Sequence, residues 1–312
     1  MATEPPRGAA APRVGFVSLV GRPNAGKSTL LNRLVGVKLA IVSDKPQTTR
    51  NRILGVRNYG GATPAQVIFV DTPGIHRPLH RMNVRMVDIA YEAMGGVDVV
   101  GLVRDVTDGV GNGDRWVLAR LAGADGPVIL ILNKIDLVAK PRLLPIIDWY
   151  QRQREFSAIV PLSAATGDGV DILERELIAR LPEGEPLYPE DYLTDQPERL
   201  LAAEMVREQV LRLTHAELPF STAVVVDRFD ESEPGWLRIY CSILVERVSQ
   251  KPIVLGPRGA RIKEIGTQAR LGLEGFFGAR VYLDLHVKVR AEWRENDRIL
   301  DQAGVAPRPS HR

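Results

Sequence analysis

Glycines, a lysine and a hydroxyl residue occur near the N-terminus at a spacing that suits a polyphosphate ligand. The pattern GxxxxGK[ST] is formed by Gly21, Arg22, Pro23, Asn24, Ala25, Gly26, Lys27 and Ser28. Glycines let backbone N–H groups approach phosphate oxygens, and a helix N-terminus adds a favourable dipole. The Lys27 ammonium suits the β- and γ-phosphates, and the Ser28 hydroxyl suits Mg²⁺. This phosphate loop, residues 21–28, predicts a nucleotide site but does not distinguish ATP from GTP.

Three later segments bear on the identity of the base. In DTPG (71–74), the Asp71 carboxylate can hold Mg²⁺ through a water, and the Gly74 amide can sense the γ-phosphate. In NKID (133–136), Asp136 can accept hydrogen bonds from guanine N1–H and the exocyclic amine, a pattern that adenine lacks. In SAA (163–165), a backbone N–H can meet guanine O6. The predicted guanine-nucleotide contacts in these segments are Asp71, Thr72, Pro73, Gly74, Ile75, Asn133, Lys134, Ile135, Asp136, Ser163 and Ala164.

These motifs need a scaffold that brings the ends of several strands together. Each follows one of a series of short apolar runs, which alternate with helical patterns such as residues 28–35. The runs are 14–20, 67–70, 97–103, 128–132 and 159–162. Strands alternating with helices predict an α/β fold with a mostly parallel sheet, whose ligands bind beyond the carboxyl ends of the strands. Arg104 interrupts the apolar character of one run and, with Asp105, is expected to mark its end.

Length and composition predict a globular protein of about two domains. The chain has 312 residues, 45% apolar and 25% charged, which excludes disordered, collagen-like and coiled-coil classes. The formal net charge is +3, too small to name a partner. No apolar run approaches the roughly 18 residues that span a bilayer, and residues 1–13 lack the apolar segment of a signal peptide. The single cysteine, Cys241, forms no internal disulfide and suits a reducing cytoplasm.

The second half of the chain is organised differently from the first. Residues 182–197 are rich in proline and carboxylates and are predicted to be a linker. Helical and strand patterns then follow in the order α-β-β-α-(α)-β, which predicts a small α+β domain. The expected organisation is a flexible tail (1–13), a nucleotide-binding domain (14–181), the linker (182–197), the small domain (198–303) and a second tail (304–312).

A GxxG turn in the small domain points to nucleic acid. The turn consists of Gly256, Pro257, Arg258 and Gly259, and it precedes a helical pattern. In a KH module, such a loop clamps single-stranded nucleotides. Basic residues concentrate here, with five against one acidic residue between positions 251 and 270. The predicted RNA contacts are the four turn residues together with Arg261 and Lys263.

The combined motifs resemble the bacterial GTPases of the Era family. The resemblance is carried by GRPNAGKST, DKPQTTR (44–50), DTPG, NKID and SAATG, followed by ELPF (217–220) and the GxxG turn, and it covers residues 14 to 300. It implies a GTPase domain joined to a KH domain that binds the 3′ end of 16S rRNA and assists 30S subunit assembly and rRNA maturation. Pro257 departs from the lysine or polar residue usual in the middle of the family's GxxG, and it removes an amide donor.

The resemblance also implies roles in hydrolysis. Thr49, in preference to Thr48, is expected to coordinate Mg²⁺ together with Ser28 and Asp71. The catalytic set is then Asn24, Lys27, Thr49 and Gly74. The position after DTPG, often glutamine in such GTPases, is Ile75, which cannot orient water. Slow intrinsic turnover is therefore expected. Asn24 either ligates K⁺ against the phosphates or only stabilises the turn of its loop.

Two other functions are compatible with these residues. One is a passive RNA-binding assembly scaffold with vestigial hydrolysis, and the other is a GTPase acting in RNA modification, for which no cofactor motif stands out. The protein is expected to be a cytoplasmic monomer. The resemblance leaves open a peripheral contact with the inner face of the cell membrane, although no amphipathic basic helix in the sequence demands one.

Overall fold

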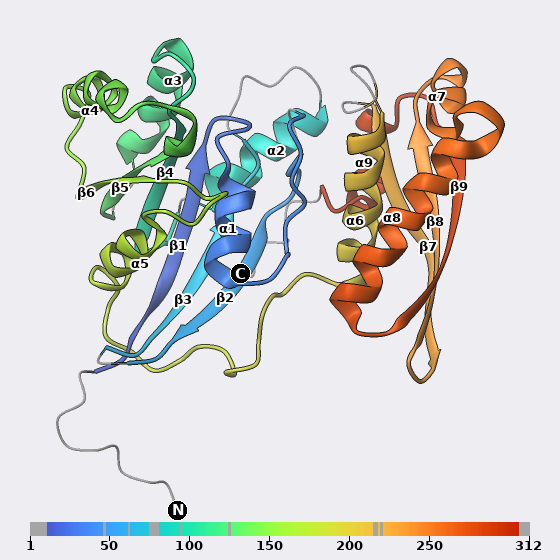
Figure 1. The fold of residues 1–312 in the computed structure, drawn as a ribbon, viewed down its shortest axis with the longest axis horizontal. Coiled ribbons are helices and arrows are strands. Elements are labelled where there is room, and N and C mark those ends of the chain that lie inside the picture. The colour runs from blue at the N-terminus through green and yellow to red at the C-terminus, as the bar shows by residue number, and fades with distance from the viewer. Residues whose placement is uncertain are drawn as a thin grey trace, which may run out of the picture. The chain divides into compact units, whose positions relative to one another are not determined.

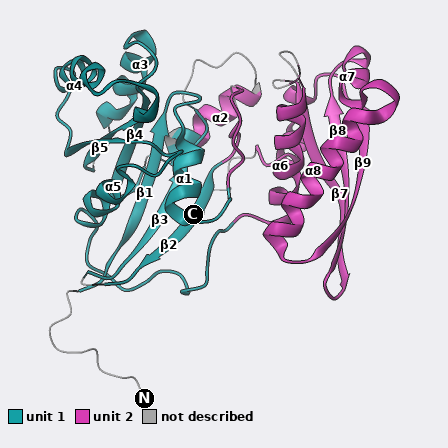
Figure 2. Ribbon diagram, in the orientation of Figure 1, with its two compact units in different colours: residues 1–39, 52–76, 90–195 teal, residues 40–51, 77–89, 196–312 magenta. Residues whose placement is uncertain are grey.

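The computed structural model describes residues 11–45, 48–61, 63–74, 81–93, 95–123, 126–214, 218 and 221–305 (Figure 1). The chain divides into two compact units, and the division is not a single cut along the sequence (Figure 2). The first unit comprises residues 1–39, 52–76 and 90–195, and the second comprises 40–51, 77–89 and 196–312.

A six-stranded sheet of order β2-β3-β1-β4-β5-β6 forms the centre of the first unit. Its strands are β1 (Arg13–Gly21), β2 (Ile53–Tyr59), β3 (Ala65–Asp71), β4 (Val99–Asp105), β5 (Val128–Asn133) and β6 (Ala158–Leu162). All neighbours are parallel except β2 and β3. Strands β3, β4 and β5 are buried along their whole length, as expected where helices cover both faces of a parallel sheet. The predicted α/β class is confirmed.

The helices of this unit follow the strands in sequence. They are α1 (Lys27–Val35), α3 (Asn112–Arg120), α4 (Leu143–Gln151) and α5 (Val170–Ile178), with short 3-10 turns η1 (Leu121–Gly123), η2 (Ile135–Leu137) and η3 (Lys140–Arg142). Helix α2 (Arg81–Glu92) lies mostly within the second unit. Among the helices of the described residues, none has both the length and the apolar character that a membrane span requires.

Strand β2 was not expected from the sequence. It is an antiparallel edge strand in which Gly55 and Arg57 interrupt the apolar residues, so its pattern is weak. Gly55 has a packing role, since a Cβ there would lie 2.7 Å from Val35 Cγ2 of α1. The missing side chain therefore lets α1 pack closely on the sheet.

The proline-rich segment, predicted as a linker, lies along the sheet of the first unit. The amide of Gln66, itself buried, donates to Tyr188 O at 2.8 Å and accepts from the backbone N–H groups of Leu187 and Tyr188. Tyr188 and Tyr192 stack with ring centroids 4.7 Å apart and pack against the cluster of Val14, Leu54, Val56 and Ile68. These contacts fix the path of the segment as far as Tyr192.

The second unit contains a three-stranded sheet together with helices. Its elements run α6 (Glu198–Leu213), β7 (Thr222–Glu233), β8 (Trp236–Val245), α7 (Lys251–Leu255), α8 (Ala260–Phe277), β9 (Arg280–Val289) and α9 (Asp297–Gln302), with 3-10 turns η4 (Val248–Gln250), η5 (Pro257–Gly259) and η6 (Trp293–Glu295). The sheet order is β7-β8-β9, with β7 antiparallel and β9 parallel to β8. The order α6-β7-β8-α7-α8-β9 is the predicted α-β-β-α-α-β arrangement of a KH domain. Cys241 lies in the apolar core, as predicted.

The described residues of the segments 40–51 and 77–89 belong to the second unit. Met82 and Met86 of α2 join an apolar cluster with Trp293 and Leu300. Arg85 forms ion pairs with Asp297 at 2.5 Å and with Asp301 at 2.7 Å.

Hydrogen bonds attach the segment 40–51 to the second unit. Arg50 Nη1 donates to Thr222 O at 2.9 Å, and Val42 N donates to Glu208 Oε1 at 3.0 Å. Arg207 donates to Thr48 O. The segment that carries the predicted Mg²⁺ ligand Thr49 is therefore built into the unit that contains the KH elements.

Candidate nucleotide site and GxxG loop

The phosphate loop joins β1 to α1 and needs glycine at two positions. Gly21 has φ 153° and Gly26 has φ 92°, both in the region that L side chains rarely adopt. A Cβ at Gly21 would collide with Val103 O, and one at Gly26 would collide with Asn133 Nδ2. Asn24 also has positive φ, 61°, which asparagine tolerates better than most residues.

Lys27 is the first residue of α1, and its ammonium turns back over the loop. Nζ donates to Gly21 O at 3.3 Å and to Arg22 O at 3.1 Å. Burial lowers the pKa of Lys27, while the carboxylate of Asp71 opposes this effect. An ammonium held by two carbonyl oxygens inside the loop is positioned to exchange them for phosphate oxygens, which bear full negative charge.

Two hard oxygen donors meet beside the loop. Ser28 Oγ donates to Asp71 Oδ2 at 2.6 Å, and Asp71 has no exposed surface. Burial raises the pKa of Asp71 to about 6, against the opposing effects of Lys27 and of hydrogen bonds from Ser28 and the Thr72 backbone. Among the described residues, Asp71 Oδ1 has no hydrogen-bond partner. A buried carboxylate oxygen without a partner, next to a hydroxyl, fits the oxygen ligands that Mg²⁺ prefers.

The DTPG segment touches the phosphate loop. Thr72 Oγ1 donates to Leu19 O at 3.0 Å, which ties the segment to β1. A Cβ at Gly74 would lie 2.7 Å from Pro23 Cα, so glycine permits this close approach. Ile75 lies outside the described residues. Thr49 belongs to the second unit, and its coordination of Mg²⁺ stays a prediction.

The NKID segment follows β5, and its asparagine serves as an internal link. Asn133 Nδ2 donates to Ala25 O at 2.8 Å, and its Oδ1 accepts from Ala164 N at 2.9 Å. Both polar ends of Asn133 thus connect the phosphate loop to the SAA segment, and its direct contact with guanine stays a prediction. Asp136, in η2, is exposed and available to a ligand.

The remaining nucleotide-site residues lie around this link. Lys134 has φ 72° and its Nζ lies 2.5 Å from Asp105 Oδ2. Ser163 Oγ accepts from Thr166 N at 3.1 Å, which shapes the turn that presents Ala164. The first unit therefore brings together the segments after β1, β3, β5 and β6, as the sequence predicted.

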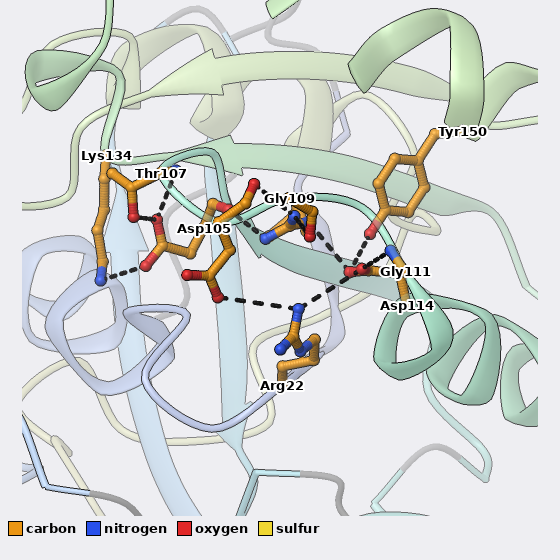
Figure 3. A network of polar contacts seen from close by, with 10 residues as sticks. Arg22, Asp105, Thr107, Gly109, Gly111, Asp114, Lys134 and Tyr150 are labelled. Carbon is orange, nitrogen blue, oxygen red and sulfur yellow. Dashed lines mark hydrogen bonds and ion pairs between the residues drawn. The ribbon is translucent and has the colours of Figure 1, made fainter. Parts of the chain in front are cut away.

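Sequence reasoning missed a polar network beside this site. Arg104, next to the last residue of β4, is 2% exposed and its Nε lies 3.0 Å from Asp114 Oδ1. Figure 3 shows how Asp114, Asp105 and their neighbours reach Arg22 and Lys134. An arginine in an apolar strand was the available signal, but the sequence did not indicate its partner.

The GxxG loop begins with left-handed backbone. Gly256 has φ 70°, and a Cβ there would lie 2.6 Å from Arg261 Cβ. Arg258 has φ 51°, and Pro257, Arg258 and Lys263 are exposed. Arg261 donates to Ile253 O, so one of its N–H groups stabilises the end of α7. The exposed cations of the loop are thus placed where a phosphate backbone can approach.

Comparison with known proteins identifies both parts. A model described as "50S ribosome-binding GTPase" matches residues 16–134, and a KH domain model matches residues 217–294. GTPase Era of Geotalea uraniireducens (strain Rf4) is 49% identical over 292 residues, which cover 94% of this chain and 97% of that protein. GTPase Era of Geobacter sp. (strain M21) is 50% identical over 295 residues, with the same coverage of both chains.

Two solved structures extend the similarity to the whole fold. One is an Era variant of Aquifex aeolicus bound to GDP and AlF4⁻, and the other is Era in complex with MgGDPNP and nucleotides 1506–1542 of 16S ribosomal RNA. Each has a TM-score of 0.89 and 42% identity, and each match covers 95% of this chain and all of the other. With the phosphate loop and the GxxG loop in place on a matching fold, the chain belongs to the Era family of GTPases, which bind and hydrolyse GTP.

Proposed function

We propose that the chain is a GTP-driven switch that binds the 3′ region of 16S rRNA and assists 30S subunit assembly and rRNA maturation. The observation that carries the proposal is the presence on one chain of the hydrogen bond from Ser28 to the buried Asp71 and of the exposed GxxG cations. The solved Era complex with MgGDPNP and nucleotides 1506–1542 of 16S rRNA, similar over 95% of this chain, supports the pairing of these two sites.

At the nucleotide end, each residue has a defined task. Lys27 exchanges the carbonyl oxygens of Gly21 and Arg22 for phosphate oxygens, while the loop amides hold the remaining oxygens. Ser28 and Asp71 would hold Mg²⁺, which neutralises charge on the phosphates when it is bound. Thr49 is the third proposed ligand. Asp136 is proposed to read the base.

The water that attacks the γ-phosphate is proposed to be oriented without a glutamine. Ile75 cannot donate or accept a hydrogen bond, so the remaining means of placing the water are the backbone, Mg²⁺ or an external group. Asn24 is the proposed K⁺ ligand, and its positive φ also supports the alternative of a turn-stabilising role. Slow basal turnover is expected because Ile75 stands in place of a glutamine, whichever role Asn24 has.

At the RNA end, Arg258 and Lys263 are the proposed phosphate contacts. Exchanging both for glutamate should weaken binding of a 3′ rRNA oligonucleotide, because each substitution turns attraction to the backbone into repulsion. The affinity for GDP should remain unchanged. Lys140→Glu with Arg142→Glu, a matched charge change at exposed positions of the first unit, is the control.

GTP turnover with and without the same oligonucleotide tests the switch. A rate that changes when RNA binds supports the proposal. Absence of turnover under both conditions would favour the passive scaffold, and unchanged RNA affinity in the Arg258→Glu, Lys263→Glu variant would refute the proposed RNA surface. Because the proposed partner is ribosomal RNA, we propose that the protein is cytoplasmic, and the peripheral membrane contact stays a prediction.

A further inference from the structure

The segment from the last residue of β4 to the first turn of α3, residues 105–114, surrounds a buried guanidinium. Arg104 Nη2 donates to Asp108 O at 3.0 Å and to Gly109 O at 2.9 Å, and Nη1 donates to Asp105 O. Its Nε pairs with Asp114 Oδ1. Three backbone carbonyls and a buried carboxylate thus bind one cation, and such charge-assisted contacts stabilise the path of the segment. We call residues 105–114 the brace.

One end of the brace meets the phosphate loop. The side chain of Asp114 is 1% exposed, and it accepts from Tyr150 Oη at 2.8 Å and from Gly111 N at 2.9 Å. Its Oδ2 lies 3.5 Å from Arg22 Nη1 (Figure 3). A Cβ at Gly113 would lie 2.9 Å from Arg22 Nε, so Arg22 of the phosphate loop packs against the brace.

The other end meets the NKID segment. Asp105 Oδ2 accepts from Lys134 Nζ at 2.5 Å, and Oδ1 accepts from Thr107 N at 2.9 Å and Thr107 Oγ1 at 2.6 Å (Figure 3). Lys134 adopts left-handed backbone with φ 72°, which is unfavourable for a residue with a side chain. It caps η2, in which Asp136 is exposed. The ion pair therefore stabilises the turn that presents Asp136.

We propose that Asp105 is a positioning residue for guanine recognition and that Asp114 is a positioning residue for the phosphate loop. Asp105 acts through Lys134 on the orientation of Asp136, and Asp114 acts through Arg22 on the phosphates. If the Asp105–Lys134 pair were an ordinary exposed ion pair, it would add little stability and would not affect discrimination between bases. The first part rests on the proposed reading of guanine by Asp136.

Dissociation constants for GDP and IDP separate the two roles. IDP keeps N1–H but lacks the exocyclic amine of guanine, so the IDP/GDP ratio of dissociation constants isolates the contact between Asp136 and that amine. Asp105→Asn should lower this ratio about fivefold, the factor that corresponds to releasing one left-handed residue. Asp114→Asn should raise the dissociation constants for GDP and for IDP equally, which leaves their ratio unchanged. Asp171→Asn, in an exposed helical ion pair with Arg175, is the matched control.

A second variant protects the test against loss of folding. Thr107 is exposed, and Thr107→Val removes one hydrogen bond to Asp105 while leaving the ion pair. It should lower the ratio in the same direction by a smaller factor. Circular dichroism and thermal unfolding verify that each variant is folded. A merely structural role would lower the melting temperature without changing the ratio.

The outcomes distinguish the inference from the function on which it rests. Asp136→Ala should bring the IDP/GDP ratio close to one. If Asp136→Ala keeps the wild-type ratio, the proposed reading of guanine is wrong. If Asp136→Ala abolishes discrimination while folded Asp105→Asn and Thr107→Val behave like Asp171→Asn, the role of Asp105 is overturned. A changed ratio in Asp114→Asn would overturn the separate role of Asp114.

Discussion

The protonation of Asp71 should control the affinity for Mg²⁺. Burial raises the pKa of this carboxyl to about 6, and a protonated carboxyl cannot serve as a ligand. At pH 7.5 nearly all molecules carry the carboxylate, whereas at pH 5 about one-tenth do. The apparent dissociation constant for Mg²⁺, measured with saturating GDP, should therefore rise about tenfold between these values.

The assay is a calorimetric Mg²⁺ titration of the GDP-bound protein at several pH values. The nucleotide phosphates titrate as well, so Asp71→Asn supplies the background, since its remaining pH dependence comes from groups other than Asp71. The wild type should show an additional fall in affinity centred near pH 6. The same pH profile in both proteins would refute the reasoning.

The same group affects the stability of the nucleotide-free protein. Because the folded-state pKa is raised from 3.8 to about 6, the folded state binds the proton more tightly than the unfolded state. The free energy of unfolding contributed by Asp71 is therefore highest below about pH 4 and falls as the pH rises to about 6. The full change is about 3 kcal/mol. Urea unfolding of wild type and Asp71→Asn across this range measures the difference.

Three further outcomes follow from particular contacts. Gly26→Ala should destabilise the protein by about 1–2 kcal/mol through its positive φ and should abolish GDP binding by displacing Asn133, as thermal unfolding and calorimetry will show. If Asn24 ligates K⁺, wild-type turnover should be faster in K⁺ than in Na⁺ and Asn24→Ala should lose the difference; equal rates in both proteins exclude the idea. Arg85→Ala should lower stability by about 1 kcal/mol, less at high salt, by loss of the ion pairs with Asp297 and Asp301.

The sequence predicted the elements that obey local rules. Strands β3 and β5 could be predicted because they are continuous apolar runs. The phosphate loop could be predicted because its glycines, lysine and serine have the spacing GxxxxGK[ST]. Strand β4 is offset from the expected run by two residues and ends at Asp105, close to the polar pair that was expected to mark its end. The KH element order followed from alternation and helical periodicity in the same way.

Contacts set by tertiary structure were not predictable. The partner of Arg104 is Asp114, which is separated from it by a loop and lies in the first turn of α3, where an acidic residue is common for local reasons alone. The proline-rich segment has the composition of a linker, yet the buried amide of Gln66 fixes it on the sheet. Neither partner can be inferred from spacing along the chain.

The packing of α2 determines where this protein can be divided. A fragment beginning at residue 196 would lack Met82 and Met86, which cover Trp293 and Leu300 in the intact chain. It would also lose Arg85, the counter-ion of Asp297 and Asp301. Such a fragment would expose an apolar patch beside two carboxylates that have lost their ion pairs with Arg85, and it should aggregate on isolation. A usable RNA-binding fragment needs a graft of residues 77–89, or replacement of the uncovered apolar side chains.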